Sequence, residues 1–430
     1  MTTSLHIEAE PLENLDGTHR TSHCAGKHEL KTAILKLIGY CRAEGWAGYD
    51  PYDALNSKIF QALPVLNSRY PRLILTQGLK ASPFNARPLL RVPKTKNPKA
   101  IALFLSAFLK LSDHEVADRE RLVQLMVEHL VDLRSPDDRY WCWGYSFPWQ
   151  TRTIVVATGS PNLVCTSYAA GALLDAYEQR QDLQCLTMAV SAADYILDKL
   201  YWVDGNSCGF SYPQPGVQSR THNANLLAAA FLCRVYKHTG EKRFLGPAMK
   251  VARYSAGTQQ ADGSWYYGEA SSQRWIDNFH TGYNLGALQH IDSCLEADEF
   301  ESRIRSGFEF YKSNFIREDG AARYFHDKTY PIDIHCVAQS IITLLEFKRL
   351  DPGSVSLANS VFAWAMKHMW DDRGFFYYRV LRFGTIRTSY MRWSQAWMML
   401  AMSALLSESE ASSPRFGKDM LTSAALNPIA

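Results

Sequence analysis

Residues 262–288 read DGSWYYGEASSQRWIDNFHTGYNLGAL, and they carry the pattern that decides the fold. The stretch begins as a glycine turn, continues through aromatic and charged residues, and ends in a helix of small residues. The same succession of a Gly-aromatic turn and a mostly apolar helix occurs five times, with turn glycines at Gly144, Gly209, Gly263, Gly320 and Gly374. These glycines are 65, 54, 57 and 54 residues apart, a period that is typical of helical repeats.

Each repeat supplies two helices of different character. The helix at 224–233, ANLLAAAFLC, is apolar on every side, whereas the helix at 245–260, LGPAMKVARYSAGTQQ, keeps a charged face. A helix that is apolar all round is packed all round, and an amphipathic helix is solvated on one side. We therefore predict an all-α closed ring, an (α/α)6 toroid of six helical hairpins, or of seven. Residues 101–111 and 121–133 form a further pair, and we expect 28–80 to supply the rest.

The composition is that of an ordinary globular chain. The chain has 430 residues with a formal net charge of +3, which argues against a nucleic-acid partner. The N-terminus lacks a signal-like pattern and no apolar run is long enough to span a bilayer, so we expect a cytoplasmic protein without a transmembrane segment. Nine scattered cysteines without a CxxC pair predict reduced thiols.

The two ends of the chain are polar and lack a sustained hydrophobic period. Such composition is typical of disordered segments. We predict disordered tails at 1–27 and 408–430 around a toroid domain at 28–407.

In a ring of hairpins every inner helix begins at the same end, so the residues around each first turn converge on one rim. A concave site of aromatic and a few polar side chains is the usual form of a ligand pocket. Aromatic faces beside carboxylate, His and Arg groups suit sugars, which stack their C–H face and hydrogen-bond their hydroxyls. The predicted sugar-binding residues are Trp143, Tyr145, Trp149, His222, Asn223, Trp265, Trp275 and Trp393.

The rim also carries the groups that catalysis needs. Glu269, Asp277 and Asp333 are carboxylates at rim turns, and glycoside hydrolysis normally uses two carboxyl groups about 5 to 10 Å apart. A purely structural role for Asp277 would be that of a helix N-cap. The predicted catalytic residues are Glu269, Asp277, His280, Tyr283, Asp333, His335, Tyr390 and Arg392.

Three histidines suggest a different chemistry. His222, His280 and His335 fall at nearly equivalent places in successive repeats, 58 and 55 residues apart. Histidine and tyrosine can exchange protons near neutral pH, so such a pair could abstract the C5 proton of a uronate. Arg392 would then bind the uronate carboxylate, or would instead form an interhelical ion pair. Core packing is the structural interpretation of Trp397.

Four resemblances bear on function. The repeat resembles the six-hairpin glycosidase superfamily, and GWAGYDPYDALNS at 45–57 is similar to toroid proteins encoded in bacterial exopolysaccharide biosynthesis clusters. The run FYYRVLRFGTIRTSYMRWSQAWMMLAMSALL at 376–406 is similar to the toroid end of glucuronyl C5-epimerases. QQADGSW at 259–265 resembles the Q-x3-G-x-W turn motif of terpenoid cyclases, although the Asp-rich DxDD motif of those enzymes is absent. The Q-x3-G-x-W motif is more simply interpreted as a way of tying an outer helix to the next turn.

These resemblances imply a carbohydrate-active protein of exopolysaccharide biosynthesis, a glycoside hydrolase-like enzyme acting on an oligosaccharide, a polysaccharide or a lipid-linked repeat unit. A uronate C5-epimerase or lyase, a non-catalytic glycan-binding or scaffolding toroid that works with other biosynthetic proteins, and a terpenoid cyclase-like toroid are the alternatives. We expect no cofactor, because the sequence lacks clustered metal ligands and a Gly-rich phosphate loop. A Ca²⁺ ion held by rim carboxylates stays open.

Overall fold

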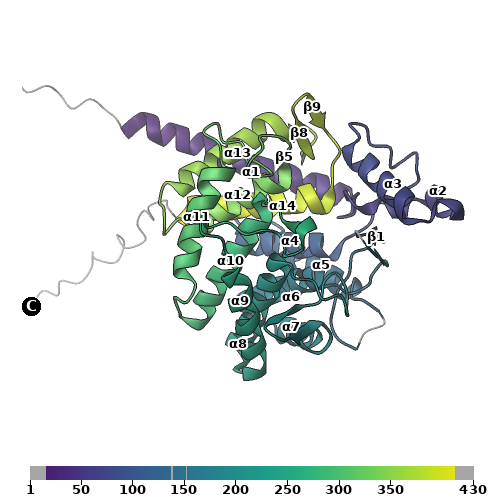
Figure 1. The fold of residues 1–430 in the computed structure, drawn as a ribbon. Helices are drawn as coiled ribbons and strands as arrows, with labels where there is room; N and C mark the ends of the chain where they lie inside the picture. The colour runs from purple at the N-terminus through teal and green to yellow at the C-terminus, as the bar shows by residue number, and fades with distance from the viewer. Residues whose placement is uncertain (1–15, 137–138, 152, 412–430) are drawn as a thin grey trace, which may run out of the picture.

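The computed structural model describes residues 16–136, 139–151 and 153–411 (Figure 1). Six inner helices form the centre of the fold: α4 (Pro98–Lys110), α6 (Leu163–Arg180), α8 (His222–Thr239), α10 (Asn278–Leu295), α12 (Ile334–Glu346) and α14 (Trp397–Ala411). Six outer helices cover them: α5 (Arg119–Asp132), α7 (Leu183–Tyr195), α9 (Lys242–Gly257), α11 (Glu301–Phe315), α13 (Ser354–Met369) and α1 (Asp16–Ala43).

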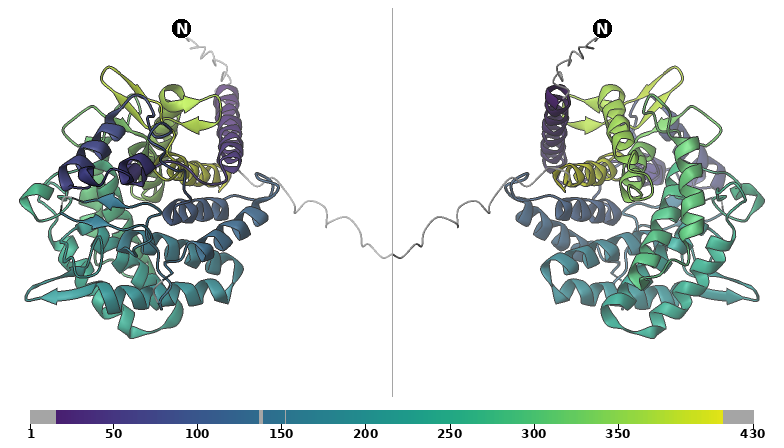
Figure 2. Two further views of the ribbon diagram at one scale, coloured as in Figure 1. Left: turned by 90° about the vertical axis from the view of Figure 1, so that its right-hand side faces the viewer. Right: turned by 90° about the vertical axis from the view of Figure 1, so that its left-hand side faces the viewer.

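The inner helices form a closed ring. Each one packs against the next in chain order, and α14 packs against α4 to complete the circle. The N-terminal helix α1 packs on α14, so the outer partner of the last inner helix comes from the start of the chain. Figure 2 shows α1, in purple, beside the yellow-green C-terminal elements. The predicted toroid is confirmed, and the described residues form six hairpins; the region 28–80 supplies the outer helix α1 but no further inner helix.

The predicted difference between inner and outer helices is also observed. In α8 the small residues Ala228 and Ala229 are fully buried, because neighbouring helices approach from every side. In α9 the apolar residues Phe244 and Val251 are buried, while the charged face stays in solvent. The ring core therefore lies between the inner and outer layers and at the contacts between successive inner helices.

The repeated glycine has a geometric cause. Gly263 and Gly320 adopt φ angles of +89° and +85°, which favour glycine. A Cβ atom at Gly263 would lie 2.4 Å from the carbonyl oxygen of Ser306, and one at Gly320 would lie 2.5 Å from that of Ser360. Both carbonyls belong to the following outer helix. The backbone of each turn therefore packs directly against the next hairpin. The glycine recurs once in every repeat because this contact recurs.

The Q-x3-G-x-W motif has the structural role that was predicted for it. The side-chain nitrogen of Gln259, just after α9, donates to the carbonyl of Gly263 (3.0 Å) and to that of Arg303 in α11 (2.9 Å). One amide thus joins an outer helix, the turn that follows it and the next outer helix.

Short antiparallel strands lie in the connections between the helices of the ring. They are β1 (Trp149–Gln150) with β2 (Val155–Val156), β3 (Tyr201–Asp204) with β4 (Ser207–Phe210), β6 (Trp370–Asp371) with β7 (Phe375–Phe376), and the sheet of β5 (Ile332–Asp333), β8 (Arg379–Leu381) and β9 (Gly384–Ile386). Between α1 and α4 the chain forms η1 (Asp53–Asn56), α2 (Lys58–Gln61), η2 (Pro64–Leu66) and α3 (Arg69–Ala81), which project to one side of the ring (Figure 1). The π-helical turns are η3 (Ile196–Leu200) and η5 (Met391–Ala396), and η4 (Ser271–Gln273) is a 3₁₀ turn.

The predicted tails overlap the helices at both ends. Helix α1 begins at Asp16, so residues 16–27 are helical, and α14 continues to Ala411. Residues 1–15 and 412–430 lie outside the described residues. No helix in the described ranges is long and apolar enough to cross a membrane. None of the cysteines whose side chains are described forms a disulfide.

Candidate active site

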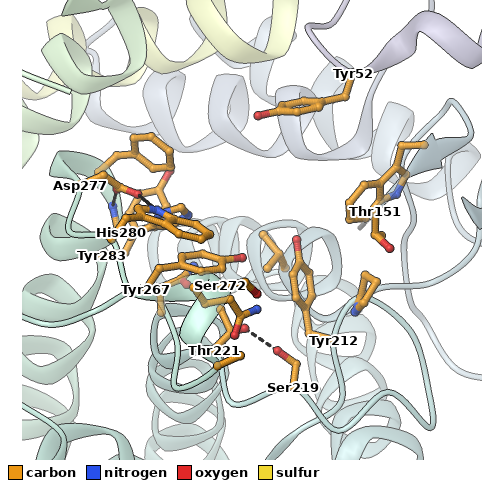
Figure 3. Close-up of a pocket in the computed structure, with 18 of the residues that line it drawn as sticks. Tyr52, Thr151, Tyr212, Ser219, Thr221, Tyr267, Ser272, Asp277, His280 and Tyr283 are labelled. Atoms are coloured by element: carbon orange, nitrogen blue, oxygen red, sulfur yellow. Dashed lines mark hydrogen bonds and ion pairs between the residues drawn. The ribbon is translucent and has the colours of Figure 1, made fainter. Parts of the chain in front are cut away.

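The first turns of the inner helices surround a cavity of about 1470 Å³. Every inner helix contributes to its wall, α14 through the preceding turn η5. Figure 3 shows Asp277, His280 and Tyr283 on one side of this cavity and Thr151 on the other, with Tyr52 at the top of the view and Tyr212 below it. The convergence of first-turn residues on one rim, predicted from the repeat, is confirmed.

Asp277 and His280 form a hydrogen-bonded pair on the cavity wall. Asp277 caps α10, because its Oδ1 accepts a hydrogen bond from the backbone N–H of His280 (3.0 Å). Its Oδ2 accepts from Nε1 of Trp275 (2.8 Å) and lies 2.7 Å from Nδ1 of His280. The Asp277 side chain is 1% exposed and that of His280 is 20% exposed. The carboxylate therefore holds the Nδ1–H tautomer, which leaves Nε2 as the basic atom of the ring.

A second pair lies deeper. The hydroxyl of Tyr283 is 2.6 Å from Nε2 of His335. The His335 ring is stacked between Phe279 and Trp397, with centroids 4.5 Å away on each side. Burial, together with the neighbouring Lys99 and Arg392, holds the pKa of His335 well below its ordinary value. Burial likewise raises the pKa of Tyr283 far above its usual range. Both groups are therefore neutral at pH 7, and the predicted packing role of Trp397 is confirmed.

Arg392 has a carboxylate partner within the protein. Its Nε and one terminal nitrogen bind the two oxygens of Asp50 at 2.6 and 2.8 Å, and both side chains are about 95% buried. The guanidinium also lies 5.0 Å from the centroid of Tyr145. Because Asp50 uses the bidentate fork, Arg392 lines the cavity as half of an ion pair. It is not the free carboxylate receptor that the uronate hypothesis requires.

Two of the predicted catalytic residues lie behind the cavity wall. Asp333 is fully buried, where it caps α12 and binds Arg379 (2.5 Å) and Nε1 of Trp393 (2.8 Å). Tyr390 is also fully buried, against the guanidinium of Arg87 at 4.8 Å. The prediction that they reach the cavity is therefore wrong, because each side chain is used in packing the ring.

Glu269 does line the cavity, but it is engaged. One oxygen accepts a hydrogen bond from the hydroxyl of Tyr254 (2.5 Å), and the other lies 3.2 Å from a guanidinium nitrogen of Arg220. Within the described residues, no group of three or more His, Cys, Asp and Glu side chains is arranged to hold a metal ion.

Some of the predicted sugar-binding residues line the cavity, and others are buried in the ring core. Those on the cavity wall are Tyr145, Trp149, Asn223, Trp275 and Trp393. Trp143 is fully buried and donates its Nε1–H to the carbonyl of Leu130 (2.7 Å). Trp265 and His222 are each 2% exposed. These last three belong to the ring core and not to the pocket, which corrects the prediction.

Several residues of the cavity wall were not predicted from the sequence. Lys99 lies in the first turn of α4 and is 3% exposed, with Nζ 3.9 Å from the ring centroid of Tyr168. Burial and the nearby Arg392 hold the pKa of Lys99 well below its ordinary value. Tyr267 stacks on Trp275, with centroids 4.5 Å apart and planes 13° from parallel. The rule that first-turn residues face the rim would have identified Lys99.

Comparison with known proteins shows which solved structures share this fold. Neither a family model nor a curated protein matches the sequence. Among solved structures, a family 76 α-mannanase of Bacteroides thetaiotaomicron is similar with a TM-score of 0.59 and 12% identity, over 75% of this chain and 90% of that one. An unsaturated glucuronyl hydrolase from Streptococcus agalactiae is similar with a TM-score of 0.58 and 10% identity, over 95% of this chain and 99% of that one.

A cellobiose 2-epimerase from Spirochaeta thermophila is similar with a TM-score of 0.56 and 16% identity, over 73% of this chain and 85% of that one. The chain thus shares the (α/α)6 toroid of these proteins. At such identities the likeness establishes the fold alone.

Proposed function

We propose that this six-hairpin toroid is a carbohydrate-active enzyme in which His280 abstracts a proton from a sugar carbon, as an epimerase, isomerase or lyase does. The observation that carries the proposal is the Asp277–His280 pair on the wall of an aromatic cavity. Its short contact of 2.7 Å fixes the tautomer of a histidine whose other nitrogen has no hydrogen-bond partner among the described residues. A base prepared in this way suits proton transfer near neutral pH.

The reaction balances as a proton transfer. The C–H bond next to a carbonyl or carboxylate group breaks, the proton moves to Nε2 of His280, and the electron pair enters that group as an enolate. Asp277 stabilises the imidazolium that forms. The Tyr283 phenol keeps its proton at pH 7 and shares it with neutral His335, so this pair, which lies on the same side of the cavity as His280, is the candidate acid for returning a proton to the carbon.

The aromatic wall supports a sugar as the substrate. The stacked pair of Tyr267 and Trp275 offers a flat apolar face, and Tyr145 and Trp149 line the same cavity. A cavity of about 1470 Å³ exceeds the size of most small-ligand pockets. An oligosaccharide or a chain end of a polysaccharide would fill it.

Glycoside hydrolysis is the second candidate, because Asp277 and Glu269 line the same cavity and hydrolases are among the proteins of similar fold. Hydrolysis needs one carboxylic acid and one carboxylate with a free reacting oxygen. Both oxygens of Asp277 and both oxygens of Glu269 are held by donors. Proton abstraction by His280 uses the same contacts without breaking them, and we therefore prefer it.

The proposal also includes the biosynthetic process in which the reaction takes part. The similarity of residues 45–57 to toroid proteins of exopolysaccharide clusters supports a role in polysaccharide biosynthesis, with other biosynthetic proteins as partners. Within this segment lies Asp50, which binds Arg392 at the cavity wall. The segment thus belongs to the architecture of the site.

Proton NMR in D₂O tests the proposal. The purified protein is incubated with uronate-containing and neutral oligosaccharides, alongside His280→Gln, Asp277→Asn and the control His290→Gln, which changes an exposed residue at the far end of α10. Deuterium entering one sugar carbon without chain shortening, lost in the first two variants and kept in the control, is the expected result. We expect Asp277→Asn to slow exchange by about 10²- to 10⁴-fold.

Two outcomes would contradict the proposal. New reducing-end signals without carbon-bound deuterium would establish hydrolysis. Binding of the oligosaccharide without either signal would favour a non-catalytic glycan-binding toroid.

A further inference from the structure

The segment between α1 and α4 exposes an unusual amount of apolar surface. We define the basic lobe as residues 57–96, which contain α2, η2 and α3 and project from the ring (Figure 1). Five of its large apolar side chains, those of Val65, Tyr70, Ile74, Phe84 and Leu89, are between 72% and 84% exposed. In the rest of the described chain, Phe383 alone among large apolar residues reaches this range. Such clustering marks an interaction surface.

Charge on the same lobe has one sign. No Asp or Glu occurs between Asp53 and Asp113, whereas the lobe contains eight Lys and Arg residues. Lys58, Arg69 and Arg91 are exposed, and no acidic side chain of the described residues pairs with them. The partner of this surface must therefore offer negative charge beside apolar groups.

Helix α3 shows how the two properties combine. Tyr70 and Ile74 lie four residues apart on its outer face, while Thr76 and Leu79 are buried on the inner face. The helix thus rests on the protein by one side and presents apolar side chains to solvent on the other. An amphipathic segment with basic flanks and an outward apolar face is typical of proteins that bind at a membrane surface.

A shallow pocket in the lobe favours lipid over an acidic protein. It has a volume of about 250 Å³, and its lining combines Lys58 and Arg91 with Ile59, Ala62 and Leu63. Two cations beside an apolar floor match a phosphate headgroup joined to its glycerol and acyl carbons. We propose that the basic lobe docks on a membrane containing anionic lipids, with Tyr70, Ile74 and Phe84 among the headgroups.

Docking would also orient the cavity. Leu73 and Gln77 of α3 line the large cavity, so the helix that meets the membrane forms part of the cavity wall. The cavity would then lie next to the lipid surface, where a lipid-linked saccharide is held. This last consequence rests on the proposed function, whereas the docking itself does not.

Sedimentation of the full chain with vesicles tests the docking. The vesicles contain phosphatidylcholine, with and without phosphatidylglycerol, at low and at physiological salt. Ile74→Ser with Phe84→Ser removes apolar contacts, and Lys58→Gln with Arg91→Gln removes charge. The control Leu183→Ser changes a side chain that is 69% exposed at the start of α7, at the end of the ring opposite the cavity.

The expected result is salt-sensitive binding to vesicles with phosphatidylglycerol, reduced about tenfold or more by each double variant and unchanged in the control. Circular dichroism of the variants confirms that they fold. Absence of wild-type binding, or binding that both double variants retain, would overturn the inference. So would a wild-type dimer in analytical ultracentrifugation that Ile74→Ser with Phe84→Ser dissociates, because a second copy would then occupy the surface. The deuterium assay is independent of these outcomes, so the two proposals fail separately.

Discussion

The acid stability of this protein should depend in part on a buried ring, that of His222. It is the first residue of α8 and is 2% exposed. Its Nε2 lies 3.3 Å from the hydroxyl of Thr258, and its Nδ1 has no hydrogen-bond partner among the described residues. Burial lowers the pKa of His222 from 6.5 to about 4, although the nearby carboxylate of Glu269 opposes this shift.

The sign of the effect follows from proton uptake. Below pH 6.5 the unfolded chain protonates this histidine, whereas the folded protein resists protonation until about pH 4. The unfolded state binds more protons in that window, so the free energy of unfolding falls as the pH falls. For these two pKa values the loss is about 1.4 kcal/mol at pH 5.5 and about 3 kcal/mol at pH 4. Above about pH 7.5 the contribution vanishes.

Urea unfolding of the wild type and of His222→Gln, followed by tryptophan fluorescence, measures this loss. Glutamine keeps a polar side chain that can hydrogen-bond Thr258 but does not titrate. His335 titrates equally in both proteins, so the difference between the two free energies isolates His222. We expect that difference to shift by about 3 kcal/mol in favour of the variant between pH 7.5 and pH 4. A difference that stays constant over this range would refute the reasoning.

Three further predictions concern stability. Lys99→Met should raise the free energy of unfolding at pH 7, because burial lowers the pKa of Lys99 in the folded protein and the variant removes that cost of folding; urea unfolding without a gain would contradict this. Asp50→Asn should cost about 3 to 5 kcal/mol, because it leaves the buried Arg392 without its carboxylate; a loss below about 1 kcal/mol would mean that the guanidinium finds another partner. Gly263→Ala should cost about 2 kcal/mol or more, since its Cβ would meet the Ser306 carbonyl at a positive φ; an unchanged melting temperature would exclude the contact.

The ring could be predicted because its cause is local and repeated. Gly263 and Gly320 are glycines for the same reason, which is contact with the next outer helix. The part of the ring that could not be predicted is its closure. Helix α1 pairs with α14 across almost the whole length of the chain, and no periodic signal connects two ends that meet once. The same holds for Asp50 and Arg392, which are 342 residues apart.

The rim was predicted better than the directions of its side chains. His222, His280 and His335 appeared equivalent in the sequence, yet they are the first residue of α8, the third of α10 and the second of α12. Each step along a helix rotates the side chain by about 100°, so a difference of one or two positions separates the cavity from the core. His222 therefore points into the core while its neighbour Asn223 lines the cavity. Repeat spacing alone does not resolve such a difference.

The two aspartate caps suggest how a repeated structural device becomes a site. Asp277 and Asp333 each cap an inner helix, and each accepts a hydrogen bond from a tryptophan Nε1. They differ in the further partner of Oδ2, which is the guanidinium of Arg379 at Asp333 and the imidazole of His280 at Asp277. A guanidinium stays protonated at any physiological pH, so the first arrangement is a fixed ion pair. An imidazole can gain and lose a proton there, so the second arrangement can do chemistry with the same cap.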